Sequence, residues 1–199
     1  SVHRTRLLLC SRTDTATINH VENLATPDDR AIVAPNNDTL YSSAWYNLRY
    51  GDLIITVPAM DHPQRYWNVM ICDGYTHVTY VCRRHHGING AQVRVTWDPT
   101  KPPRNDDSKV VTVGTPTAWV IIRVLVESPE DIDSARALQR AITVEAPAGH
   151  PKARTERAGR ATTIAQAGAD FFSEVRRYIE SDPVAATHLA LPTAGGGGG

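Results

Sequence analysis

The sequence predicts a mainly β (α+β) fold: an antiparallel β-sandwich-like domain followed by two C-terminal accessory helices. Three observations lead to this prediction. Between positions 40 and 126, short segments rich in Val, Ile, Thr, Tyr and Trp are separated by clusters of Gly, Pro and Asp. Some of these segments are apolar at alternate positions, and others are apolar on both sides. After Val126 the spacing of apolar residues becomes helical.

The expected strands span residues 40–49, 52–57, 66–72, 76–83, 91–97, 109–113 and 117–126. The segment "AQVRVTW" has one apolar and one polar face, so one side of that strand should face water. The segments "YWNVMIC" and "AWVIIRVLV" are apolar on both faces and should form central strands that are covered on both sides. The turns "RYGD" and "DGY" are typical of hairpins, and the Pro-rich segment 98–109 should be a loop.

Two helices should follow the strands. Ser128 is a suitable N-cap, Pro129 fits the first helical position, and Asp131 would complete a capping box. The apolar face of this helix would comprise Ile132, Ala135, Leu138 and Ile142. A second helix is expected over residues 165–181, where Asp182-Pro183 would end it.

The chain should therefore divide into four parts. We expect an irregular segment over 1–30, a β-rich domain over 31–145, a linker and helix over 146–182, and a flexible tail over 183–199. The 199 residues suffice for one domain with a substantial core.

The charge balance argues against several classes of protein. Lys plus Arg and Asp plus Glu each number 21, so the formal net charge is zero. Binding nucleic acid or an anionic membrane as the main function would need a basic excess. A neutral protein has little electrostatic protection against self-association, so we expect a homo-oligomer. No apolar run approaches the roughly 18 residues of a membrane span.

The chain has three cysteines: Cys10, Cys72 and Cys82. A disulfide framework usually has an even and larger number of cysteines, so this sequence does not indicate one. Cys72 and Cys82 fall on strands that should pair, but out of register with each other. We expect buried free thiols, which fit a reducing compartment better than secretion.

Arg123 is the strongest single clue to a site, because it interrupts the apolar strand "WVIIRVLV". A guanidinium stays charged, so it must either reach solvent in a cleft or pair with a carboxylate. Asp38 and Asp73 are the candidate partners. The interpretation as an internal ion pair and the interpretation as an anion-binding arginine both remain open.

The polar run Asn36-Asn37-Asp38 also has two interpretations. Asn and Asp satisfy the amides of turns, so a turn alone would explain them. Together with Tyr41 and Tyr66, however, they could form a polar cup for a small ligand. Asp73 could likewise be the carboxylate of an Asx turn, or a pocket carboxylate flanked by Tyr75 and His77.

Motifs for metals, cofactors and nucleophiles are absent from the sequence. No Cys/His spacing resembles a zinc site, and the adjacent His85 and His86 would point to opposite faces of a strand. No P-loop, G-x-G-x-x-G or G-x-S-x-G motif occurs. Ser42 and Ser43 lack an evident His-Asp partner in register. We therefore expect no metal and no cofactor.

The segments "PNNDTLYSSAW", "LIITVP", "RYWNVMICDGYT" and "RVLVESPEDIDSARALQ" resemble the domain of unknown function 1254 family, over roughly residues 19–145. The resemblance implies a mainly β domain with accessory helices. In this family a second domain, of unknown function 1214, often follows; the chain is similar to a short member without it. The family usually has Asp where Asn47 stands and Gly-Pro where Gly51-Asp52 stands. The positions that keep the family motif are Asn36, Asn37, Asp38, Tyr41, Arg65, Tyr66, Asp73 and Arg123.

Two functions follow as hypotheses. The first is a binding or assembly module that self-associates and holds a small polar ligand in a cleft formed by Asn36, Asn37, Asp38, Tyr41, Tyr66, Asp73 and Arg123. The second is an enzyme for a small polar or anionic substrate, with Asp38 or Asp73 as general base and Arg123 stabilising an anionic intermediate. The absence of a nucleophile-base pair favours the first.

Overall fold

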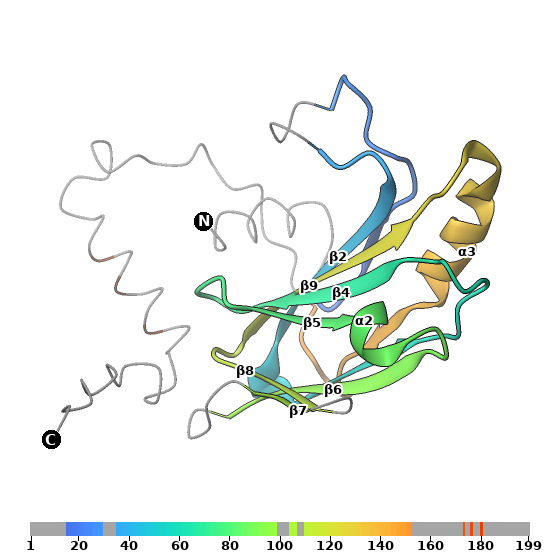
Figure 1. Cartoon of the computed structure of the whole chain (residues 1–199). Coiled ribbons are helices and arrows are strands. Elements are labelled where there is room, and N and C mark those ends of the chain that lie inside the picture. The colour runs from blue at the N-terminus through green and yellow to red at the C-terminus, as the bar shows by residue number, and fades with distance from the viewer. Residues whose placement is uncertain are drawn as a thin grey trace, which may run out of the picture.

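The computed structural model describes residues 15–29, 35–98, 104–106 and 110–152, together with Ser173, Arg176 and Glu180. Within these residues, two five-stranded sheets pack face to face (Figure 1). Sheet A has the order β1 (Asn19–Val21), β2 (Thr39–Asn47), β9 (Thr117–Leu125), β4 (Trp67–Cys72) and β5 (Val78–Cys82). Sheet B has the order β10 (Thr143–Glu145), β3 (Leu53–Val57), β6 (Ala91–Trp97), β8 (Val110–Val113) and β7 (Arg104–Asp106). The predicted β-rich sandwich is confirmed, and β6 and β8 form its one parallel pair among the described strands.

The seven predicted strands all form, and none of their ends shifts by more than two residues. β2 stops at Asn47 because its side chain accepts a hydrogen bond from the Arg49 N–H and caps a 3-10 turn, η1 (Leu48–Tyr50). The structure adds the short strands β1 and β10, and β7 lies within the segment predicted as a loop. Strands of three residues carry too little periodicity to be recognised in a sequence.

One of the two predicted hairpins is wrong. The "RYGD" turn does not pair β2 with β3, because β2 belongs to sheet A and β3 to sheet B, so the chain crosses between the sheets there. The "DGY" hairpin is confirmed, since β4 and β5 pair antiparallel from Asn68↔Cys82 to Cys72↔Val78.

The core lies between the two sheets and is filled by alternate residues of the longer strands. Sheet A contributes Leu40, Val69 and Ile122, and sheet B contributes Leu53 and Ile55; each is at most 1% exposed. Burying a side chain of this size contributes about 1.5–3 kcal/mol relative to leaving it exposed. The other face of sheet A is turned away from this core, and we call it the outer face.

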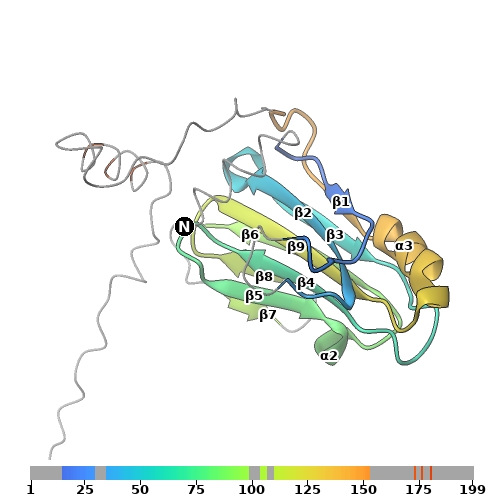
Figure 2. The ribbon, with the colours of Figure 1, turned by 90° about the horizontal axis from the view of Figure 1, so that it is seen from above.

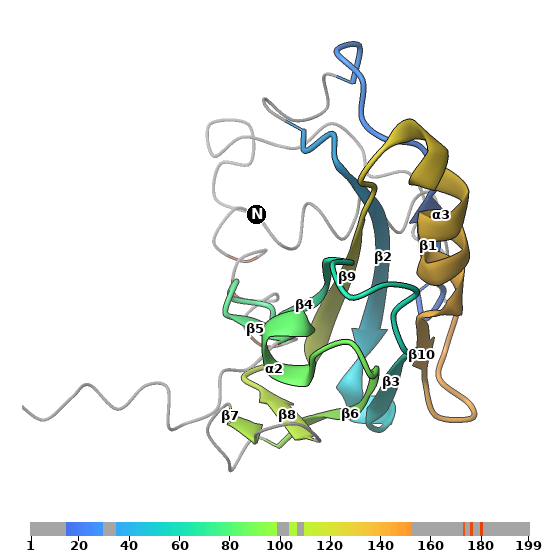
Figure 3. The same ribbon diagram turned by 45° about the vertical axis from the view of Figure 1, so that its right-hand side comes forward.

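Helix α3 (Ile132–Ala141) lies beside β1 and β2 at one edge of the sandwich (Figures 2 and 3). The 3-10 turn η2 (Pro129–Asp131) precedes it, with Ser128 as N-cap and Pro129 first, as predicted. The expected capping box does not form: the Asp131 carboxylate accepts from the Glu127 N–H and from Arg65 instead. On the predicted apolar face, Ala135, Leu138 and Ile142 join the core.

The predicted second C-terminal helix lies outside the described residues, apart from Ser173, Arg176 and Glu180, which are helical. A short helix that was not predicted, α2 (Arg83–His86), follows β5 directly. His85 and His86 therefore lie on a helix and not on a strand. No helix among the described residues is long and apolar enough to cross a membrane.

The cysteine prediction is partly corrected. Cys72 is buried and free as predicted, whereas Cys82 is free but only half-buried. Cys82 lies on β5 at the edge of the described sheet A, where one flank has no neighbouring strand to cover it. Cys10 lies outside the described residues.

Candidate functional site

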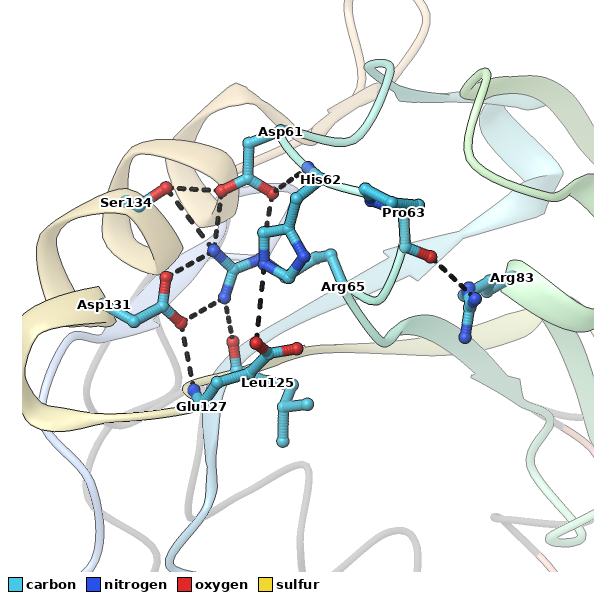
Figure 4. A network of polar contacts seen from close by, with 9 residues as sticks. All are labelled: Asp61, His62, Pro63, Arg65, Arg83, Leu125, Glu127, Asp131 and Ser134. Carbon is cyan, nitrogen blue, oxygen red and sulfur yellow. Dashed lines mark hydrogen bonds and ion pairs between the residues drawn. The ribbon is translucent and has the colours of Figure 1, made fainter.

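Among the described residues, Arg65 is the one fully buried cation; it is 0% exposed and lies in the connection between β3 and β4. Figure 4 shows the polar contacts around it. Its Nε and one terminal nitrogen donate to the two Asp61 oxygens at 3.0 and 2.6 Å. Asp131, at the start of α3, accepts from both terminal nitrogens, one of them at 2.6 Å. The Leu125 carbonyl accepts at 2.7 Å and the Ser134 hydroxyl at 3.4 Å. The guanidinium thus joins a loop, the end of β9 and α3.

The charges in this cluster stabilise one another. The Arg65 hydrogen bonds hold the pKa of Asp61 far below its ordinary value, although partial burial opposes the shift. They also lower the pKa of Asp131. Asp131 first, and then Asp61, raise the pKa of Arg65 above its already high value. All three groups are therefore ionised at neutral pH.

Asp61, His62 and Asp131 also offer ligand atoms within 4.8 Å of one another, the spacing of a metal site. The carboxylate oxygens of this group are already bound to Arg65, however. A cation placed there would meet the guanidinium charge. The cluster is therefore a structural cross-link in which every nitrogen of Arg65 is used.

The outer face of sheet A has a different character. Strand register places its side chains in rows that run across the strands. The first row contains Cys72, Trp119 and Trp45. The second contains Tyr80, Met70, Ile121, Ser43 and Asn19. The third contains Cys82, Asn68, Arg123, Tyr41 and Val21. None of these residues is acidic.

Arg123 is half-buried at the centre of the third row. Its guanidinium carbon lies 5.3 Å from the centroid of the Tyr41 ring, a cation–π contact. Asn68 is its register neighbour on β4 and donates from Nδ2 to the Tyr66 hydroxyl at 3.0 Å. Among the described residues, no carboxylate forms an ion pair with Arg123. The predicted internal pair with Asp38 or Asp73 is therefore not formed.

Trp45 and Trp119 stack in the first row, with ring centroids 5.1 Å apart and planes within 7°. Trp45 is 3% exposed and Trp119 is half-buried. Neither indole N–H group has a hydrogen-bond acceptor within the described part of the chain. The stack therefore lies two rows from the guanidinium, with the Trp119 ring partly exposed and the Trp45 ring buried behind it.

Unpartnered polar atoms are concentrated on this face. Seven buried side-chain polar atoms lack a partner in the described residues, and five of them belong to residues of the outer face of sheet A. These five are Thr39 Oγ1, Trp45 Nε1, Asn68 Oδ1, Trp119 Nε1 and Arg123 Nε. A buried polar atom without a partner costs about 1–3 kcal/mol, and a water molecule or a ligand would supply the missing hydrogen bond. The face remains accessible at Tyr66, Val78 and Tyr80, which are 39–41% exposed.

The structure brings together only some of the predicted site residues. Tyr41, Tyr66 and Arg123 lie on the outer face of sheet A. Asp38 lies in an exposed turn beyond the end of β9, where its carbonyl accepts from the Val126 N–H. The Asn36 carboxamide oxygen accepts from the Asp38 N–H at 2.9 Å, which makes an Asx turn. This contact fits the interpretation of the polar run as a turn. Asn37 is exposed beside it.

Asp73 lies far from Arg123. It follows Cys72, five positions along β4 from Asn68, the neighbour of Arg123, which corresponds to about 17 Å of strand. Its Oδ1 accepts from the backbone N–H groups of Tyr75 and His77 at 2.8 and 2.9 Å. These bonds hold a turn in which Thr76 has a φ of 72°, an unfavourable value for a β-branched residue. The Asx-turn interpretation accounts for these contacts.

Ser42 has a histidine partner that the sequence did not reveal, but no Asp completes a His-Asp pair with it among the described residues. His20 on β1 places Nδ1 2.8 Å from the Ser42 hydroxyl oxygen. Ser42 is 1% exposed and lies on the side of sheet A that faces the core. Burial is the main cause that lowers the pKa of His20. This hydrogen bond joins β1 to β2. Because the Ser42 hydroxyl is buried, a substrate cannot reach it.

Comparison with known proteins gives the family. The model of the family described as "Protein of unknown function (DUF1254)" matches residues 15–146, which include all of the described strands. The chain belongs to this family. No curated protein matches this DUF1254 chain.

Among solved structures, the DUF1254 chain resembles the crystal structure of the VPA0106 protein from Vibrio parahaemolyticus. The two are 18% identical, and the TM-score is 0.49. The match covers 73% of this chain and 40% of the other, so the chain spans less than half the length of that protein.

Two residues of this DUF1254 protein were missed by sequence reasoning. Arg65 was noted only for its motif, because "PQRYWN" gives no sign of burial and its acids come from other parts of the chain. Asn68 lies within the otherwise apolar segment "YWNVMIC". A polar side chain in an apolar strand is the signal that pointed to Arg123, so the same signal could have identified Asn68.

Proposed function

We propose that this DUF1254 protein is a binding module that holds a small anionic ligand with a flat apolar body on the outer face of sheet A. The observation that carries the proposal is the half-buried Arg123, whose Nε has no partner and whose rows on this face contain no acidic residue, as far as the structure describes the chain. A carboxylate can accept from a guanidinium in a charge-assisted hydrogen bond. The half-buried rings of Trp119 and Tyr41 supply flat apolar surfaces for the remainder of such a ligand, and the buried Trp45 ring supports Trp119 from behind by stacking.

Asn68 supports the choice of ligand. Its Nδ2 is occupied by the Tyr66 hydroxyl, so its free Oδ1 is an acceptor for a donor group on the ligand. Tyr66 is 39% exposed and would lie at the rim. The proposed set is therefore Arg123, Asn68, Tyr41 and Tyr66, flanked by the tryptophans.

The alternative of an enzyme with Asp38 or Asp73 as general base has less support. Neither carboxylate lies on the Arg123 face, and the Oδ1 of Asp73 already accepts two backbone N–H groups. Self-association also remains a proposal. It draws on the exposed Val78 and Tyr80 of β5, the last strand of the described sheet A. Native mass spectrometry would give the mass of the assembly and of any ligand that co-purifies.

Titration calorimetry with indole-3-acetate and with its neutral amide tests the binding proposal. We expect the carboxylate to bind more tightly than the amide, and Arg123→Gln to weaken carboxylate binding by about tenfold or more. The matched control is Arg94→Gln, an arginine on sheet B that is 54% exposed. Equal affinity for both compounds, or an equal loss in both variants, would contradict an anion site at Arg123.

A further inference from the structure

Cys82 is a thiol that the proposed binding function leaves unused. It is half-buried on β5 and forms no disulfide. Its Sγ lies 3.8 Å from Nδ1 of His85, three residues further along the chain in α2. This is hydrogen-bond distance for sulfur, so the imidazole is placed to accept the thiol proton.

The surroundings of this thiol are basic. The four residues of α2 are Arg83, Arg84, His85 and His86, and none of its first turn is acidic. Arg83 donates to the Pro63 carbonyl at 2.7 Å, while Arg84 is exposed. Reactive cysteines are found in such electropositive and partly exposed surroundings, because the thiolate is the nucleophile.

A second observation points to a ligand at this position. The register neighbour of Cys82 on β4 is Asn68, which is 6% exposed and has an unpartnered Oδ1. Arg123 follows Asn68 in the same row. Opposed residues on neighbouring strands have Cβ atoms about 5 Å apart, so thiol, amide and guanidinium form one continuous line.

We propose that Cys82 is a thiol-exchange site for small anionic disulfides, with His85 as proton acceptor. The Cys82 thiol gives its proton to His85, and the thiolate attacks one sulfur of the disulfide. A bond forms between Cys82 and that sulfur, the original S–S bond breaks, and the other half leaves as a thiolate that takes the proton. The positive side chains of α2 and Arg123 favour a disulfide that carries carboxylates. Only this preference for anions rests on the proposed binding function.

The test uses the full chain with Cys10→Ser, so that Cys72 and Cys82 are the remaining thiols. The two probes are 5,5′-dithiobis(2-nitrobenzoate), which is anionic, and 2,2′-dithiodipyridine, which is neutral. Exchange rates at neutral pH are divided by those of 2-mercaptoethanol with the same probe. Peptide mass spectrometry identifies the modified cysteine, and Cys82→Ser should remove the fast phase, because Cys72 is buried.

His85→Ala should slow the exchange of Cys82 about tenfold with both probes, as loss of a proton acceptor requires. His86→Ala is the matched control in the same helix and should leave the rate unchanged. Arg84→Gln and Arg123→Gln should lower the normalised rate with the anionic probe only. Since His85 is exposed, His85→Ala should fold normally.

The outcomes separate this inference from the proposed function. If His85→Ala does not slow Cys82, or if the fast thiol is Cys72, the exchange site is refuted whatever Arg123 binds. If the anionic probe has no advantage, the preference for anionic disulfides is refuted. If exchange depends on His85 but indole-3-acetate does not bind, the proposed function fails while the reactive thiol stands.

Discussion

At the scale of single residues, Arg65 and Arg123 show how position decides the role of a guanidinium. Arg65 is fully buried, and two carboxylates, a carbonyl and a hydroxyl accept its hydrogen bonds. Arg123 is half-buried, has an unpartnered Nε and contacts an aromatic ring. Arg65 therefore stabilises the fold, whereas the Arg123 guanidinium can still donate a hydrogen bond to a ligand.

Replacing Arg65 by Met should lower the free energy of unfolding by about 3–5 kcal/mol. The substitution removes the cation and leaves Asp61 and Asp131 facing each other. Urea denaturation measures the change. Arg94→Met is the control, because Arg94 is 54% exposed and its pair with Asp52 is 3.6 Å long; it should cost no more than about 0.5 kcal/mol. Similar losses in both variants would show that Arg65 is not the cross-link.

Stability should also fall in acid because of the same cluster. The folded pKa values of Asp61 and Asp131 lie below the unfolded values, which are about 4. A lowered carboxyl pKa contributes stability that is present above the unfolded pKa and is lost as the pH falls through the folded one. Urea denaturation between pH 5 and about pH 2 should therefore show a steeper loss in the wild type than in Arg65→Met. Parallel curves would mean that other carboxyl groups cause the acid sensitivity.

At the scale of elements, α3 is attached to sheet A by Gln139, which is 0% exposed. Its Nε2 donates to the carbonyls of Val21 on β1 at 3.3 Å and Tyr41 on β2 at 3.0 Å. One side chain thus joins the helix to the edge strand and its neighbour. β1 has only three residues, so contacts of this kind decide whether it stays paired.

Gln139→Leu should therefore loosen β1 more than the rest of the domain. It leaves two part-buried carbonyls without this donor, at a cost of about 1 kcal/mol. Hydrogen exchange followed by mass spectrometry should show faster exchange over residues 19–21, with β9 unchanged. Gln92→Leu is the control, because that side chain makes only an exposed bond of 3.3 Å to Thr56. Equal protection of β1 in both variants would contradict the role given to Gln139.

At the scale of the whole molecule, sequence periodicity was sufficient to place the strands but not to assign them to sheets. The alternation in "AQVRVTW" located β6 at its observed ends. The "RYGD" turn looks local, yet it joins β2 in sheet A to β3 in sheet B, because sheet membership depends on which distant strands pair. The parallel pairing of β6 with β8 likewise has no local signature.

The candidate site could be predicted only in part for the same reason. A charged side chain in an apolar strand is a local signal, and it directed attention to Arg123, whose role as a ligand-binding residue stays a proposal. The rule that a buried guanidinium must meet acids also holds in this fold, but it applies to Arg65. One of the acids that pairs with Arg65 is Asp131 of η2, which lies 66 positions away in the chain. Nothing in the sequence around Arg65 reports that pairing.

The nearly parallel stacking of the Trp45 and Trp119 rings has a spectroscopic consequence. Two indole transition dipoles 5.1 Å apart couple as an exciton, which splits their absorption into two bands with circular dichroism of opposite sign. The size of that couplet depends on the angle and spacing of the rings. The protein therefore carries an intrinsic chromophore pair that reports, without any label, when the side chains around it rearrange.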